Sequence, residues 1–229
     1  MQKRLIIDSE LNWAHHIAKI SKSCNGILWS LYPLQPMLSS LNRKLIINSY
    51  VLSKIRYMCP VWGNCSGAKL NTVDSILRRA GRFVLGLGKH DSVKADITSE
   101  LKWLFTNYMY QCEILKIAFC INRGKCPPYF SNYVDFDDTI VRETRYHKYL
   151  HTNLKCNYVN RSFKHKAKQL WVDLPCDIVN SKSLQVFKKS VTKYYLDLQL
   201  FESSSCHDVD VCNYSCIDSA IKSVASSIS

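Results

Sequence analysis

The stretch KLNTVDSILRRAGRFVLGL, residues 69–87, decides the fold class of this chain. Its apolar residues recur at alternating spacings of three and four, which is the period of one face of an α-helix. Gly86 and Gly88 follow as a stop signal, because glycine readily adopts the left-handed conformation in which many helices end. The stretch therefore predicts an amphipathic helix with one buried face, formed by Leu70, Val73, Leu77, Ala80, Val84 and Leu87.

The polar face of this predicted helix carries three arginines. At about 100° per residue, Arg78, Arg79 and Arg82 fall almost opposite the centre of the apolar positions, and no acidic residue lies among them. Three guanidinium groups on one solvent-facing side have the geometry to bind phosphate oxygens. An ordinary solvated helix face carries the same kind of residues, so both interpretations stay open on this pattern alone.

Other segments of the chain also show apolar residues at helical spacing. Pro33 and Pro36 end the first predicted helix, and Ser39 or Ser40 begins the second. The apolar row of the second predicted helix is Leu41, Leu45, Leu52 and Ile55. A later segment, 106–122, is apolar on two faces, which is typical of a helix at the centre of a bundle. We therefore predict an all-α fold, a helical bundle followed by a smaller and less regular helical region. The predicted helical segments are 12–31, 39–59, 69–87, a short one that opens at Asp91, 106–122, 163–171 and 184–195.

The composition of the 229 residues is that of a globular protein. Hydrophobic residues make up 47% and charged residues 21%, while seven Gly and six Pro exclude collagen-like and low-complexity chains. The N-terminal residues lack the apolar core of a signal peptide, and no uncharged run is apolar enough to span a membrane. We therefore expect an intracellular protein, nuclear or cytoplasmic, that is not secreted.

The positive charge is concentrated towards the N-terminus. The chain has 31 Lys and Arg against 18 Asp and Glu, a formal net charge of +13. Residues 1–89 have a net charge of +10, whereas residues 201–229 have a net charge of −3. The composition and the sign of the net charge predict three regions: a helical bundle over 1–125, a helical region with an irregular loop over 126–200, and a disordered acidic tail over 201–229.

This charge points to a polyanionic partner. A surface of one sign attracts nucleic acid through its phosphate backbone without reading its sequence. We therefore expect nonspecific nucleic-acid binding, and we expect neither a membrane nor a small-molecule substrate as partner. Six basic residues on the two preceding helices add to the positive field of the three arginines, Lys54 and Arg56 among them. Four of the six are predicted to contact the nucleic acid: Lys19, Lys22, Arg43 and Lys44.

Several motifs that suggest phosphate or metal chemistry are incomplete. The run GLGKH, residues 86–90, lacks the earlier glycine and the Ser or Thr of a phosphate-binding loop. The acidic run DFDD, residues 135–138, is not followed by a second apolar strand, so we interpret it as a surface turn. His15 and His16 begin a helix, one facing outward and one inward, where a packing role is favoured over metal binding.

The cysteines do not form a metal-binding or disulfide framework. Eleven cysteines without a regular spacing are typical of reduced thiols in a reducing compartment. Cys206 and His207 with Cys212 and Cys216 are separated by spacers of five and three residues, whereas zinc knuckles use two. We therefore expect no metal and no cofactor, and the sequence shows no catalytic constellation.

An ordered series of short motifs over residues 5–200 resembles one protein family. The series resembles the reverse transcriptase of non-LTR retrotransposons of the jockey-like and LINE type, in the thumb and the region after it. The motifs are LIID (5–8) with Leu11, Trp13, His16 and Ile17, the segment 50–57, VWGNC (61–65), RRAGRFVLG (78–86), PYF (128–130), TR (144–145), RSF (161–163), LW (170–171), LP (174–175), SL (183–184) and FKK (187–189).

The resemblance implies a fragment that is not an enzyme. In the parent proteins the catalytic aspartates belong to fingers and palm regions that would precede residue 1, and the thumb is a helical bundle that grips the template–primer duplex. An RNA–DNA hybrid of this kind is gripped by its shape and backbone, which suits the arginine face. The alternative is an inert relic, or a protein-interaction module whose basic charge has no nucleic-acid role.

Overall fold

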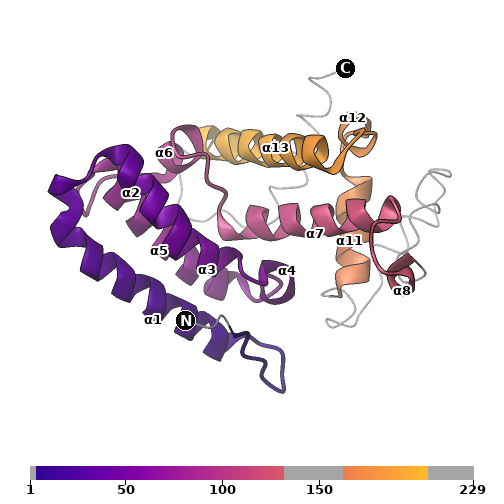
Figure 1. Cartoon of the computed structure of the whole chain (residues 1–229), viewed down its shortest axis with the longest axis horizontal. Helices are drawn as coiled ribbons and strands as arrows, with labels where there is room; N and C mark the ends of the chain where they lie inside the picture. Colours follow the sequence, from indigo (N-terminus) through magenta and orange to yellow (C-terminus); the bar gives the residue numbers. More distant parts are fainter. Residues whose placement is uncertain (1–3, 132–161, 206–229) are drawn as a thin grey trace. The chain divides into compact units, whose positions relative to one another are not determined.

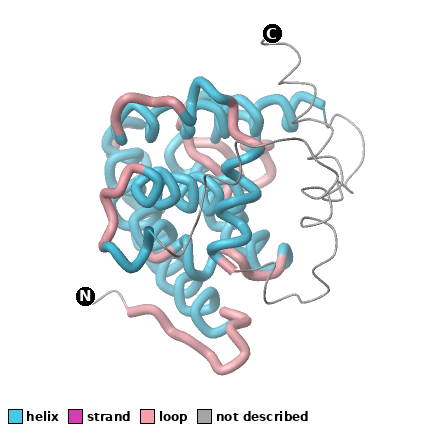
Figure 2. The backbone as a smooth tube through the Cα atoms, turned by 90° about the vertical axis from the view of Figure 1, so that its right-hand side faces the viewer, coloured by secondary structure: helices cyan, strands magenta, loops and turns pink. Residues whose placement is uncertain are grey.

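The described part of the chain consists of helices and loops (Figure 2). The computed structural model describes residues 4–131 and 162–205, and no strand occurs in these ranges, so the predicted all-α fold class is confirmed for them. The elements are α1 (Ala14–Leu31), the 3₁₀-helix η1 (Tyr32–Met37), α2 (Ser40–Ile47), the π-helix η2 (Asn48–Leu52), α3 (Ser53–Arg56), α4 (Cys59–Trp62), α5 (Gly67–Leu85), α6 (Lys94–Ser99), α7 (Thr106–Asn122), α8 (Pro128–Ser131), α11 (Phe163–Val172), α12 (Cys176–Val179) and α13 (Leu184–Ser205).

The described residues divide into two compact units. The first unit contains residues 4–110 and 199–205, and the second contains residues 111–131 and 162–198. The change from one unit to the other falls within α7 and again within α13. The two helices therefore each belong to both units, whereas the composition of the sequence predicts a first boundary near residue 125.

Three regions singled out in the sequence lie wholly or largely outside the described residues. They are the acidic run 135–138, the cysteine cluster 206–216 and most of the predicted acidic tail. Of that tail, residues 201–205 belong to α13, which therefore ends later than the periodicity indicated.

The helix α5 is the centre of the first unit. It contacts α1, α2 and α6, and Figure 1 shows α1, α2 and α5 running side by side. The predicted amphipathic helix is confirmed, and it ends at Gly86, which has a left-handed φ of 76°. Its buried residues are Leu70, Val73, Ile76, Leu77, Ala80, Gly81, Phe83 and Val84.

The helix α6 approaches α5 closely at Gly81. A Cβ atom on Gly81 would lie 2.9 Å from Cγ1 of Ile97 and 3.3 Å from Cγ2 of Val93. Carbon atoms pack at about 3.5–4.0 Å, so a side chain here would displace α6. The close packing of α6 therefore explains why a glycine occupies this position in the middle of a helix.

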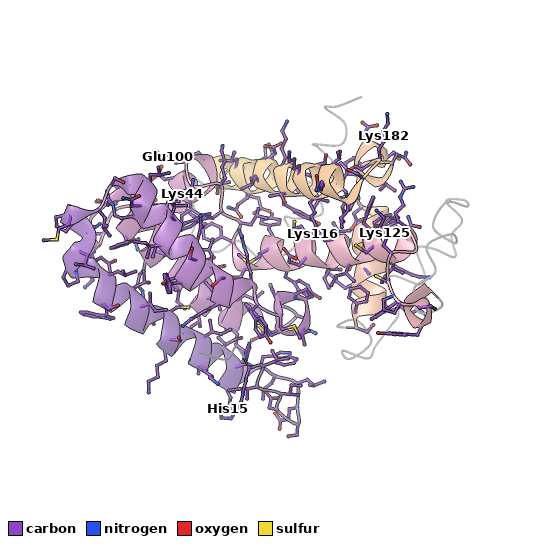
Figure 3. All side chains as sticks on the ribbon, in the orientation of Figure 1. His15, Lys44, Glu100, Lys116, Lys125 and Lys182 are labelled. Atoms are coloured by element: carbon purple, nitrogen blue, oxygen red, sulfur yellow. The ribbon has the colours of Figure 1, made fainter. Side chains whose placement is uncertain are left out.

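The helix α1 places one histidine in the core and leaves the other in solvent, as predicted. His16 is buried, and its Nδ1 accepts a hydrogen bond from the backbone N–H of Ile6 at 3.3 Å. His15 is exposed (Figure 3). Burial lowers the pKa of His16, and the charge of Lys19 lowers it further. The imidazole of His16 is therefore neutral, and in this form it holds the N-terminal segment through the hydrogen bond from Ile6.

The turn that leads into α1 is organised by Asp8. Its two carboxylate oxygens accept hydrogen bonds from the backbone N–H groups of Asn12 and Trp13, each at 2.8 Å. Hydrogen bonds to the charged form, that from Asn12 foremost, lower the pKa of Asp8. The buried indole of Trp13 donates to Oδ1 of Asn64 at 3.1 Å, which ties this turn to the residues after α4.

The second predicted helix forms, but only the later half of its predicted apolar row is buried. Ser39 caps it as predicted, and α2, η2 and α3 follow one another without a break. Leu41 and Leu45, expected to face inward, are 68% and 57% exposed, whereas Leu52 and Ile55 are fully buried. The wider turn of the π-helix η2 rotates the residues after it relative to those before it, so one apolar row does not stay on one face.

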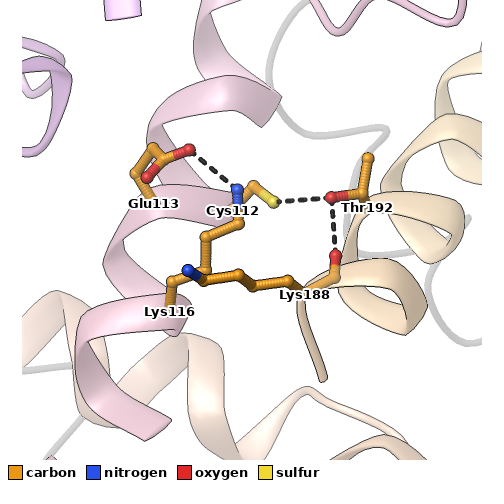
Figure 4. A network of polar contacts seen from close by, with 5 residues as sticks. All are labelled: Cys112, Glu113, Lys116, Lys188 and Thr192. Atoms are coloured by element: carbon orange, nitrogen blue, oxygen red, sulfur yellow. Dashed lines mark hydrogen bonds and ion pairs between the residues drawn. The ribbon is translucent and has the colours of Figure 1, made fainter. Parts of the chain in front are cut away.

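The second unit has an aromatic core of its own. Phe119 of α7 stacks on Phe187 of α13 with ring centroids 4.2 Å apart, and Trp171 of α11 lies 6.0 Å from Phe187. Between α7 and α13, Sγ of Cys112 lies 3.6 Å from Oγ1 of Thr192 (Figure 4). The predicted two-sided apolar character of 106–122 is confirmed, because α7 buries residues around most of its circumference.

The two helical glycines Gly81 and Gly26 should respond oppositely to alanine. Gly26 lies in α1, and a Cβ atom added there would meet nothing within 4 Å, so Gly26→Ala gains the helix propensity of alanine, about 1 kcal/mol. Gly81→Ala gains the same propensity, but overpacking against Ile97 costs about 1–3 kcal/mol. We expect chemical denaturation to show a more stable Gly26→Ala and a less stable Gly81→Ala. Two variants of equal stability would contradict this, because they would show that α6 can move away from Gly81 without a cost in free energy.

The pKa of His16 makes the stability of the first unit depend on pH. Because the folded pKa lies below the unfolded value of 6.5, the unfolded chain takes up a proton first as the pH falls. The contribution of neutral His16 to the free energy of unfolding is therefore fully present above pH 6.5 and is lost as the pH falls below that value. His16→Asn keeps an acceptor for the N–H of Ile6 and does not titrate. We expect its stability, relative to the parent chain, to rise as the pH is lowered. A difference that stays constant with pH would contradict this role.

Candidate nucleic-acid interface

The three arginines lie on the side of α5 that faces away from its buried residues, as the helical period predicts. Arg79 is exposed, and Arg78 and Arg82 are half-buried. Of their neighbours on α5, Asn71 and Ser75 are uncharged, whereas Asp74, one helical turn before Arg78, carries a carboxylate. The face is therefore cationic, but its three members differ in how far they reach into solvent.

Arg79 connects α5 to α1. Its Nη1 donates a hydrogen bond to Oδ1 of Asn25 at 2.8 Å, in an exposed position. The partner is a neutral amide, so the positive charge of Arg79 is not compensated. A phosphate oxygen can replace or join this amide without breaking an ion pair.

Arg82 is oriented by the loop after α5. Its Nε donates to the backbone carbonyl of Asp91 at 3.0 Å. The carboxylate of Asp91 is used elsewhere, because its Oδ2 accepts the N–H of Gly88 at 2.6 Å. The outer edge of the Arg82 guanidinium group therefore keeps donors for an anion, since a single carbonyl accepts only one of its five N–H groups.

Arg78 is the least available of the three. Its Nη2 donates to Oγ of Ser75 at 3.1 Å, and its charge acts on the nearby Asp74. Oδ1 of Asp74 accepts the backbone N–H of Thr106 at 2.8 Å and its hydroxyl group at 2.6 Å, which caps the start of α7. Burial nevertheless raises the pKa of Asp74, against the lowering effect of these bonds and of Arg78 and Lys94. Part of the field of Arg78 therefore stabilises this buried carboxylate.

Among the described residues, no carboxylate forms an ion pair with these arginines. Within residues 4–131 and 162–205, the ion pair that the geometry shows is Lys116 with Glu113, in the second unit (Figure 4). Charged side chains on protein surfaces usually have both signs interspersed. A set of three arginines with only neutral acceptors is suited to bind an external anion.

Two of the four additional basic residues are placed to extend the interface. Lys19 and Lys22 are exposed on α1, the helix whose Asn25 contacts Arg79. Lys22 precedes Asn25 by three residues, so the two side chains are neighbours on the surface of α1. The structure thus brings Lys22 close to the α5 arginines in a single unit.

The other two, Arg43 and Lys44, are engaged with helix ends. Nη1 of Arg43 donates to the carbonyl of Phe83 at 2.9 Å, beside Nε2 of Gln35, which donates to the same oxygen at 3.0 Å. Nζ of Lys44 lies 3.4 Å from the carbonyl of Glu100 (Figure 3). A cation at the carboxyl end of a helix neutralises its partial negative charge, so we assign Arg43 to the stability of α5.

Sequence reasoning missed the neutral members of the interface. Asn25 and Ser75 orient Arg79 and Arg78, yet neither belongs to a charge or apolar pattern. A signal for Ser75 existed, since it precedes Arg78 by one helical turn. No comparable signal existed for Asn25, because its contact joins residues 54 positions apart.

The remaining sequence motifs have structural roles where they are described. Gly86 is the end of α5, and its N–H donates to the carbonyl of Arg82 at 2.9 Å. In the described ranges no group of three or more His, Cys, Asp and Glu side chains is arranged to hold a metal ion. None of the described helices combines the length and the apolar character needed to cross a lipid bilayer.

Comparison with known proteins identifies no relative. No protein-family model, no curated protein and no solved structure matches this chain.

The different roles of Arg43 and Arg79 predict different effects on stability. Arg43→Ala removes a charge-assisted hydrogen bond to Phe83, which contributes about 1.5–3 kcal/mol. Arg79→Ala removes an exposed contact with an amide, and surface changes of this kind stay within about 0.5 kcal/mol. We expect denaturant midpoints to fall for Arg43→Ala only. Equal losses in both variants would contradict the assignment of Arg43 to the helix end.

Proposed function

We propose that this chain is a non-catalytic nucleic-acid-binding module that grips the backbone of a duplex without reading its sequence. The observation that carries the proposal is the arginine face of α5, where the acceptors that Arg78, Arg79 and Arg82 bind within the described residues are neutral. Lys19 and Lys22 on α1 extend the same positive field.

The chemistry of the face suits phosphate groups. A guanidinium group presents several donors in one plane and binds two oxygens of a phosphate at once. The three groups sit on a helix whose other side is buried, so their backbone is fixed before a ligand arrives. Such preorganisation lowers the entropic cost of binding.

We further propose that the chain derives from the thumb and post-thumb part of a non-LTR retrotransposon reverse transcriptase. The ordered motifs over residues 5–200 support this origin, and an all-α architecture is compatible with it. Several motif residues at the start of the series are core residues of the first unit, among them Trp13, His16 and Ile17. On this proposal the ligand is an RNA–DNA hybrid or a related duplex, gripped by shape and backbone.

A salt titration of hybrid binding tests the proposed function. Each phosphate that the protein neutralises adds about 0.9 to the slope of log affinity against log salt. We expect Arg78/Arg79/Arg82→Ala to flatten this slope by about 2 to 3 and to lower the affinity at least about tenfold at moderate salt. The measurement is fluorescence anisotropy of a labelled RNA–DNA hybrid.

A charge-matched variant separates the face from net charge. Arg56, Lys189 and Lys193 are exposed and lie outside the α5 face, so replacing all three by alanine removes the same charge. This variant should lose much less affinity and keep nearly the full slope. Equal losses in both triple variants would mean that the chain binds through its net charge alone, and the interface would be wrong.

A second candidate function is a protein-interaction module. The observation that favours it is a set of exposed apolar side chains on η1 and α2: Met37 is 82% exposed, and Leu41 and Leu45 lie one helical turn apart. This candidate predicts hybrid binding no stronger than that of an unrelated protein of equal charge. It also predicts that Leu41→Glu weakens binding to a protein partner and leaves hybrid binding unchanged.

A further inference from the structure

One tryptophan of the chain is exposed to solvent. Trp29, near the end of α1, is 77% exposed, and no aromatic ring of the described residues stacks on it. Burial of a large aromatic side chain is strongly favourable, so such an exposed indole is unusual in a protein surface without a ligand. The other tryptophans, Trp13, Trp62, Trp103 and Trp171, are all buried.

Trp29 lies in the same row of α1 as a lysine and an asparagine. Lys22, Asn25 and Trp29 are separated by three and then four residues, so they are neighbours along one face of the helix. Arg79 of α5 donates to the middle member of this row at 2.8 Å. The indole is therefore in line with the contact that joins α1 to the arginine face.

The surroundings of this row are open and positively charged. The sequence of α1 contains no acidic residue, and its two lysines are exposed. Gly26 is exposed next to Asn25, and a side chain there would meet nothing within 4 Å. A flat molecule has room to lie against the helix beside the indole.

We propose that Trp29 is a stacking platform for an unpaired base, continuous with the arginine face through Asn25 and Arg79. The inference rests on the proposed nucleic-acid binding and adds a ligand class to it, a duplex that carries a short single-stranded overhang. Arg78, Arg79 and Arg82 bind phosphates of the duplex, while Lys22 holds the backbone of the overhang and Trp29 stacks on a base. Proteins that bind single strands combine aromatic platforms with basic grooves in this way.

The charge around Trp29 favours a nucleic acid over an apolar partner. Aromatic residues at protein interfaces usually lie in an apolar patch with charges depleted from its centre. Here the indole lies one helical turn from Asn25, which accepts from Arg79, and two turns from Lys22, with the half-exposed Tyr32 one turn further along the chain. No carboxylate on α1 balances these cations. A nucleic-acid strand supplies both the negative charge and the aromatic faces that this row lacks.

The exposure of Trp29 provides a direct measurement of binding. Since the other four tryptophans are buried, acrylamide quenches mainly the emission of Trp29. We expect an RNA–DNA hybrid with a short adenine overhang to protect this emission from acrylamide, and a blunt hybrid of the same duplex length to protect it much less. Titration by anisotropy gives the two affinities in parallel.

The variants Trp29→Ala and Trp29→Phe test the stacking role. Trp29→Ala should weaken binding of the overhanging hybrid about fivefold or more and leave the blunt hybrid unchanged. Trp29→Phe should recover most of the loss, because phenylalanine keeps an aromatic face. Met37→Ala, another change of a large exposed apolar residue, is the matched control and should leave both affinities unchanged.

The outcomes distinguish this inference from the proposed function. If neither hybrid binds, the proposed function fails and the platform fails with it. The platform alone is wrong if both hybrids bind with equal affinity, if this binding requires the arginines, and if Trp29→Ala does not change it. A last outcome is that acrylamide quenches the free protein less as the protein concentration rises. A second copy of the chain then covers Trp29, and this too overturns the platform.

Discussion

The first unit depends on the burial of one face of α5. That face packs against α1, α2 and α6, and the approach of α6 is close enough to require Gly81. Because one side of the helix is fixed in the core, the other must face outward, and its backbone cannot rotate to hide the arginines. The cationic surface therefore follows from core packing, since the residues that fix the helix are not the residues that face the ligand.

The same positive charge serves two purposes in this unit. Arg43 contributes to the carboxyl end of α5 through the carbonyl of Phe83, whereas Arg79 donates a hydrogen bond to the neutral amide of Asn25. A count of basic residues treats both alike. The distinction lies in what each guanidinium group must give up to bind a phosphate: Arg43 would leave a helix end without its cation, and Arg79 would leave one exposed amide, which water satisfies.

Much of the fold was predictable because its helices have clear periods and caps. The period of 69–87 predicted α5 and most of its buried face, although Leu87 lies beyond the end of the helix at Gly86. The prediction that one of His15 and His16 faces inward and the other outward is confirmed. Leu41 and Leu45 were misplaced because a π-turn, which no periodic pattern predicts, shifts the helical register.

For the candidate interface, the arginine positions were predictable from the helix alone. Their partners were not, since they come from a different helix or from a loop.

Covalent footprinting of arginine side chains in the presence of an RNA–DNA hybrid tests the central claim most directly. Phenylglyoxal modifies exposed guanidinium groups, and mass spectrometry reports the rate at each residue. We predict that the bound hybrid slows modification of Arg79 strongly and leaves Arg56 and Arg123, both exposed outside the α5 face, unchanged. Modification of Arg79 at the same rate with and without hybrid, or protection at Arg123 instead, would contradict the proposed interface.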